Sequence, residues 1–145
     1  MYFVDRGKIE ETLVYLEKLA EWLNEQESFE TVTEQMALER AAHMAIEAVI
    51  DVGNAMIDGF IMRDPGSYDD VIDILLDEKV INDEDEKVLK EFIAFRKSLV
   101  QNYLTIVHEE VGQVFKQHAS ILPEFATKVR RYLEEELGPV SAFKA

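Results

Sequence analysis

The sequence contains no cysteine and no long uncharged apolar stretch. Without cysteine, the chain can form neither a disulfide nor a thiolate metal site, so a reducing compartment, the cytoplasm, is the natural expectation. No window approaches the roughly 18 apolar residues of a membrane-spanning helix. The N-terminal residues also lack the apolar core of a signal peptide. We therefore expect neither a membrane span nor secretion.

Positive charge is scarce as well. Fifteen lysines and arginines face thirty aspartates and glutamates, which leaves a formal net charge of −15 at pH 7. Such a chain repels polyanions at long range and lacks the basic surface typical of nucleic-acid-binding proteins. DNA is therefore not an expected partner, and any contact with RNA has to be local. The acidity itself indicates either plain solubility or a dedicated basic partner.

The chain consists of amphipathic segments separated by rare glycine and proline, and no alternating strand pattern occurs. These segments predict an all-α fold, with residues 1–137 as one domain and a flexible tail over residues 138–145. Pro123 should kink the last helix or split it at Ser120. The five predicted helices cover approximately Asp5–Glu27, Thr33–Gly59, Tyr68–Glu78, Glu84–Leu104 and Val107–Leu137.

One flank of the second predicted helix carries a row of ionisable side chains. Four of them, spaced by three or four residues, are Arg40, His43, Glu47 and Asp51. Helical spacing places them on one face. They form either a solvated flank held by pairs one turn apart or the polar wall of a cleft, and the spacing alone does not separate these interpretations.

A motif near the end of the fourth predicted helix carries a family resemblance. Arg96, four residues, Gln101, one residue and Tyr103 resemble the signature of the HepT-like branch of the HEPN ribonuclease-toxin superfamily, in which a histidine stands at the position of Gln101. Phe95, Leu99 and Val100 also match, whereas Lys97 stands where asparagine is common. Residues 37–51 resemble the family's second helix. Residues 59–70 and 136–143 are similar to its YutE-like branch.

This resemblance implies an antiparallel up-and-down bundle of about five helices that works as a homodimer. In active relatives it implies metal-independent RNA cleavage at a cleft shared by the two subunits, with no cofactor. Arginine there stabilises the charged phosphorane, and histidine transfers a proton near neutral pH. Gln101 cannot gain or lose that proton, so cleavage should be weak or lost. Arg96 and Gln101 then form a pocket for nucleotide or RNA phosphate.

The resemblance also gives Tyr103 a role, because the motif tyrosine of HepT-like toxins accepts AMP groups from a small nucleotidyltransferase antitoxin. Such an antitoxin is therefore an implied partner. The alternative for Tyr103 is a ring in the core with its hydroxyl at the rim. Arg96 can likewise pair with the acidic row of the second helix. Two further functions stay open: a non-enzymatic interaction module with an acidic surface, and an active toxin-type ribonuclease regulated by tyrosine AMPylation.

Helix geometry restricts how the motif residues can meet. Residues five apart on a helix differ by about 140° in azimuth, so Arg96 and Gln101 do not share a face, whereas Arg96 and Tyr103 do. A site that uses all three needs a helix end or a second subunit. His43, His108 and His118 were weighed as replacements for the missing imidazole, with His118 placed in an apolar seam of the last helix. None has metal-ligand spacing, so no metal is expected.

Overall fold

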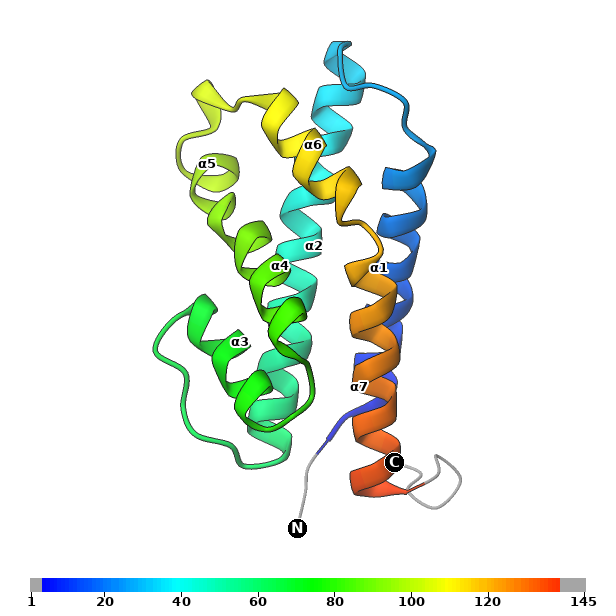
Figure 1. Cartoon of the computed structure of the whole chain (residues 1–145), viewed down its shortest axis with the longest axis vertical. Coiled ribbons are helices and arrows are strands. Elements are labelled where there is room, and N and C mark those ends of the chain that lie inside the picture. Colours follow the sequence, from blue (N-terminus) through cyan, green and yellow to red (C-terminus); the bar gives the residue numbers. More distant parts are fainter. Residues whose placement is uncertain (1–3, 139–145) are drawn as a thin grey trace.

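The computed structural model describes residues 4–138, and within this range it contains helices and no strand. This confirms the predicted all-α class. Figure 1 shows the long helices side by side along the long axis, with the shorter ones beside and above them. The helices are α1 (Arg6–Glu25), α2 (Val32–Gly59), α3 (Tyr68–Asp77), α4 (Asp83–Ala94), α5 (Arg96–Val100), the 3-10 helix η1 (Tyr103–Thr105), α6 (His108–Gln117) and α7 (Ile121–Leu137).

Several helices begin at a side chain that satisfies the free backbone N–H groups of the first turn. Thr31 forms a capping box with Glu34 at the start of α2, and Asn82 forms one with Asp85 at the start of α4. Ser67 accepts a hydrogen bond from the backbone N–H of Asp70 at the start of α3. Such caps explain why the predicted and observed starts of α2, α3 and α4 agree within a residue.

Helix α2 lies against α1, α3, α4, α5 and α6, so it forms the middle of the bundle. One apolar row of this helix is buried along its whole length, at Leu38, Ala42, Ala45, Val49, Val52 and Met56. Burial of each large aliphatic side chain contributes about 1.5–3 kcal/mol. Gly53 allows α3 to approach closely, because a Cβ atom there would lie 2.5 Å from Cγ1 of Val71.

Polar contacts attach α7 to its neighbours on two sides. Arg130 donates hydrogen bonds to Glu10 and Glu17 of α1, over 2.8–2.9 Å. Lys128 donates to Asp85 of α4, which is the buried charged residue of the described core. These contacts hold the last helix across the bundle, and the ribbons of α1 and α7 run alongside each other in Figure 1.

The fourth predicted helix is interrupted twice. At Phe95 the backbone N–H turns back to Phe92, which separates α4 from α5. Helix α5 then ends at Val100, where the N–H groups of Gln101 and Asn102 both donate to Lys97 O. The expectation that Arg96 and Tyr103 share a face of one continuous helix is therefore wrong, because the helical register is lost before Tyr103.

The predicted split of the last helix at Ser120 is confirmed, since α6 ends at Gln117 and α7 begins at Ile121. Pro123 lies in the first turn of α7, where its missing N–H removes no helical hydrogen bond. His118 does not lie in a buried seam. It caps the end of α6 and faces Glu91 at 4.0 Å.

Gly138 ends α7 with a φ of 80°, a left-handed conformation that glycine adopts without strain. The rest of the predicted tail lies outside the described residues. No helix within residues 4–138 is both long and apolar enough to cross a membrane.

Candidate functional site

Arg96 is the first residue of α5 and contacts both α2 and α3. Its Nε donates to Oε1 of Glu47 at 2.7 Å. Its guanidinium carbon lies 4.6 Å from the centre of the Tyr68 ring, a cation–π contact. The hydrogen bond from Arg96 to Glu47, with the charge of that carboxylate, raises the pKa of Arg96 above its usual value. Arg96 therefore remains a cation at any pH at which the protein is folded.

Glu47 is the residue that joins this group together. Besides Arg96, its carboxylate accepts a hydrogen bond from the Tyr68 hydroxyl at 3.3 Å. Burial, and then the charge of Glu47, raise the pKa of Tyr68, so the hydroxyl keeps the proton that it donates. His43, one turn earlier on α2, places Nε2 3.6 Å from Glu47 Oε1. We call His43, Glu47, Tyr68 and Arg96 the Arg96 cluster.

The Arg96 cluster is open to solvent on one side. The side chain of Arg96 is 33% exposed and that of Glu47 is 21% exposed. Pairing of Arg96 with the acidic row of α2, one of the two sequence interpretations, is thus observed. The pairing does not seal the arginine inside the fold. Because Glu47 takes Nε, the two terminal Nη groups are the part of the guanidinium that can meet a phosphate.

The other two residues predicted as cleft support lie on α2 but outside this group. Arg40 is exposed and forms no ion pair with any residue that the structure describes. Asp51 lines a groove of about 520 Å³ between α1 and α2, together with Lys8 and Tyr15. Burial in this groove, and then the charge of Glu47, raise the pKa of Asp51. The predicted row therefore does not form one polar wall. Glu47 contacts Arg96, whereas Asp51 faces the groove beside α1.

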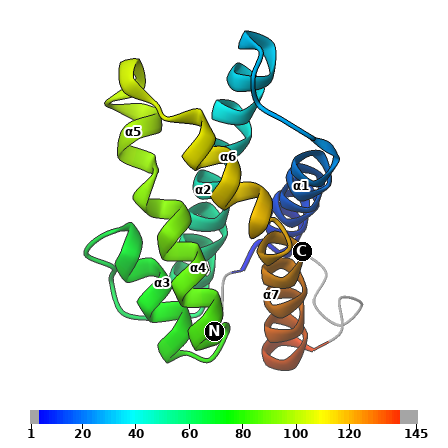
Figure 2. The same cartoon turned by 45° about the horizontal axis from the view of Figure 1, so that its top comes forward.

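Gln101 and Tyr103 lie beyond the end of α5, in the connection to α6 that stands at the upper left of Figure 2. Gln101 is exposed, and Tyr103 is 61% exposed. The interpretation of Tyr103 as a core ring is wrong, because the turn after Val100 directs the chain away from the core. Within residues 4–138 no hydrogen bond joins Gln101 or Tyr103 to the Arg96 cluster.

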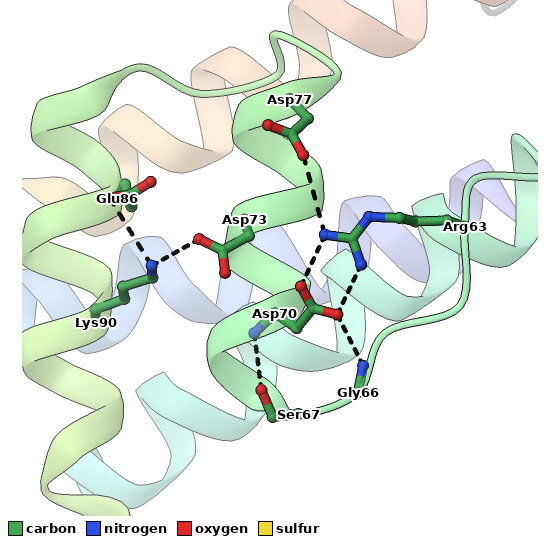
Figure 3. A network of polar contacts seen from close by, with 8 residues as sticks. All are labelled: Arg63, Gly66, Ser67, Asp70, Asp73, Asp77, Glu86 and Lys90. Atoms are coloured by element: carbon green, nitrogen blue, oxygen red, sulfur yellow. Dashed lines mark hydrogen bonds and ion pairs between the residues drawn. The ribbon is translucent and has the colours of Figure 1, made fainter.

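A second polar network holds the turn before α3 (Figure 3). Tyr68 is the first residue of this helix. Arg63 donates two hydrogen bonds to the carboxylate of Asp70, at 2.7 and 2.8 Å. The same carboxylate accepts from the backbone N–H of Gly66 at 2.8 Å. The Arg63 hydrogen bonds, with the bond from Gly66, lower the pKa of Asp70 to about 2. The turn is thereby fixed in the position that places Tyr68 over Arg96.

A family model for ribonuclease HepT-like proteins matches residues 9–129. The chain belongs to this family. It is 51% identical to YutE of Bacillus subtilis (strain 168) over 144 residues. The matched region covers 99% of this chain and 100% of YutE. The solved structure of the cytosolic protein YutE superposes with a TM-score of 0.93, at 50% identity over 99% of this chain and 100% of that one.

More distant HepT-like folds include a tri-AMPylated HEPN toxin of Shewanella oneidensis in complex with an MNT antitoxin. It has a TM-score of 0.73 at 19% identity, over 86% of this chain and 95% of that chain. At this identity the likeness shows the fold. The predicted bundle architecture of the HepT-like family is thus confirmed for this chain.

The remaining histidines of this HepT-like chain lie apart from Arg96. His108 contacts Glu39 at 2.8 Å, where α6 meets α2, and borders a groove of about 1100 Å³ between α6 and residues 27–30. No arginine lines this groove. Nor does any group of three metal-binding side chains occur within residues 4–138.

Sequence reasoning missed Tyr68 as a member of the site. It predicted the start of a helix at Tyr68 and found residues 59–70 similar to the YutE-like branch, but it gave no reason to place the ring over Arg96. The available signal was the helix cap at Ser67, which fixes the position of Tyr68 at the start of a helix. Its use would have required knowing that α3 and α5 lie on the same side of α2.

Proposed function

We propose that this HepT-like protein binds RNA or nucleotide phosphate at Arg96 as a homodimer, and that its cleavage of RNA is weak. The observation that carries the proposal is the setting of Arg96. Its Nε is held by Glu47 and its plane lies on Tyr68, while a third of the side chain stays open to solvent. A guanidinium oriented in this way can pair with two phosphate oxygens.

Weak cleavage follows from the chemistry of the motif. Transfer of a proton by a positioned side chain contributes about 10²- to 10⁴-fold to a rate, and the amide of Gln101 cannot perform it. Arg96 and binding geometry still stabilise the charged phosphorane. The protein is thus related to endoribonucleases and keeps their phosphate site, but it cleaves RNA more slowly.

Two features of the connection after α5 support the partners that we propose. Tyr103, Leu104 and Val107 are exposed apolar side chains that a second subunit could cover. The phenol of Tyr103 is also open to an enzyme that transfers AMP, which fits a small nucleotidyltransferase antitoxin acting on this chain. The Shewanella oneidensis toxin of the same fold is tri-AMPylated and bound to an MNT antitoxin. We place the complex in the cytoplasm.

The test measures binding and cleavage of a short fluorescein-labelled single-stranded RNA. We expect Arg96→Ala to raise the dissociation constant about 10- to 100-fold, because charge-assisted hydrogen bonds contribute about 1.5–3 kcal/mol. Arg131→Ala, which removes an exposed arginine of α7, is the matched control and should leave the affinity unchanged.

Cleavage gives the second half of the test. Gln101→His should raise the rate about 10²- to 10⁴-fold over the wild-type rate. Wild-type RNA cleavage as fast as that of Gln101→His would show an active toxin-type ribonuclease instead. Equal RNA affinity of wild type and Arg96→Ala would contradict the phosphate site.

A non-enzymatic interaction module is the second candidate, favoured by the exposed apolar side chains after α5 and by the acidic composition. It predicts no RNA binding by the wild type and no effect of Arg96→Ala beyond stability. The binding measurement above separates the two candidates.

A further inference from the structure

We infer that His43 is the residue that transfers the proton in the remaining RNA cleavage, in place of the histidine that Gln101 replaces. The inference rests on the proposed function, since it assigns a role within the same site. Its basis is that one carboxylate oxygen contacts both groups that the reaction needs. Oε1 of Glu47 accepts from Arg96 Nε at 2.7 Å and lies 3.6 Å from His43 Nε2.

His43 has the exposure that such a role requires. Its side chain is 32% exposed, so a ligand can reach the ring, while α2 and Glu47 limit its orientations. Nε2 faces the carboxylate of Glu47 at 3.6 Å, a charge contact without a hydrogen bond that favours a proton on this nitrogen of the ring. Nδ1 is then the basic nitrogen, and it forms no hydrogen bond with any residue in the described range 4–138. The arrangement has the form of a histidine oriented by a carboxylate, as in other proton-transfer sites.

The reaction balances without a metal or a co-reactant other than water. His43 Nδ1 takes the proton of a ribose 2′-hydroxyl, and the 2′-oxygen forms a bond to the adjacent phosphorus. The bond from phosphorus to the 5′-oxygen breaks, and that oxygen takes a proton from water. Arg96 stabilises the charge on the phosphorane. The products are a 2′,3′-cyclic phosphate and a 5′-hydroxyl, and the imidazolium returns its proton to solvent.

The other two histidines lack this arrangement. His108 contacts Glu39 and His118 contacts Glu91, and neither of these carboxylates forms an ion pair with an arginine among the described residues. His118 is nevertheless a close match to His43 in other respects. Its side chain is also 32% exposed and also faces a glutamate. His118→Gln is therefore the control for the loss of one half-exposed histidine.

The experiment measures single-turnover cleavage of the labelled RNA by wild type, His43→Ala, His43→Gln and His118→Gln. Thermal unfolding confirms that each variant is folded. Both substitutions of His43 should lower the cleavage rate about 10²-fold or more, with RNA affinity within about twofold of wild type. His118→Gln should cleave at the wild-type rate. His43→Gln keeps a polar side chain of similar length, which guards against a loss of activity through local misfolding.

Rescue by free imidazole gives a readout that a structural role would not move. Added imidazole should restore cleavage in His43→Ala, which has space for it, and should not restore cleavage in Arg96→Ala. Unchanged cleavage in His43→Ala, no rescue, or no detectable wild-type cleavage despite RNA binding would overturn the role of His43 and leave the phosphate site intact. Absence of RNA binding by the wild type would overturn the proposed function itself.

Discussion

At the scale of single residues, Glu47 carries the most contacts of the site, because Arg96, Tyr68 and His43 all face its carboxylate. Glu47→Gln keeps the shape of the side chain and removes the charge. We expect it to lower the free energy of unfolding by about 1 kcal/mol, since the pair with Arg96 is only partly buried. Urea denaturation measures the change. Glu124→Gln, at an exposed position of α7, should stay within experimental error of wild type, and an equal loss in both variants would contradict the role of Glu47.

Single residues also show where the sequence was informative about the site. The helical spacing of His43 and Glu47 puts them one turn apart on one face, and the structure places Glu47 against Arg96 and His43 against Glu47. This much follows from the period of the helix alone. The contact with Tyr68 could not be predicted, because it depends on how the turn over residues 60–67 returns the chain to α2. The interpretation of Tyr103 as a core ring is wrong for a related reason, since it extends the helix past its end.

At the scale of elements, the turn before α3 should respond to acid through Asp70. The pKa of Asp70 is lowered from 3.8 to about 2 in the folded protein, mainly by Arg63. A carboxyl whose folded pKa is lowered stabilises the fold above its unfolded pKa, and this contribution disappears as the pH falls through the folded value. Wild type should therefore melt at a higher temperature than Asp70→Asn at pH 6. The difference should shrink between about pH 4 and about pH 2.

The control for this acid response is Asp58→Asn, which changes an exposed carboxylate at the end of α2 that forms no ion pair with the described residues. Its melting temperature should follow that of wild type at every pH. A gap between wild type and Asp70→Asn that stays constant down to pH 2 would show that the carboxylate charge does not stabilise the turn.

Helix boundaries followed from sequence where a cap or a proline marks them, as at Ser67, Asn82 and the split at Ser120. The end of α5 carries no such mark. Gln101 is a good helix former, Asn102 is a poorer one, and no glycine or proline follows before α6. The helix ends there because the N–H of Asn102 reaches back five residues to Lys97 O, the carbonyl that already accepts from Gln101, and does not continue the helical pattern of bonds four residues apart.

At the scale of the whole molecule, a net charge of −15 opposes the binding of a polyanion. One oriented guanidinium in each subunit offers few phosphate contacts against that repulsion. The proposed homodimer would place two Arg96 clusters in one particle, so that a single RNA strand could contact two guanidinium groups. The amino-acid composition alone predicts this charge and the lack of a basic surface. It gave no information on how two copies meet, because an interface depends on which apolar side chains the fold leaves exposed.

The connection after α5 leaves such side chains exposed, and Leu104 is 88% exposed, more than Tyr103 or Val107. If this surface joins two copies, Leu104→Asp should convert the dimer to a monomer, because each interface would bury two added carboxylates. The melting temperature of the separated monomer should reflect loss of the partner alone, since Leu104 contributes little to the core. Sedimentation velocity over a range of concentrations measures the state. Val14→Asp, which changes an exposed apolar residue of α1, should remain dimeric. A monomeric wild type, or a Leu104→Asp protein that stays dimeric, would place the contact between copies elsewhere or remove it.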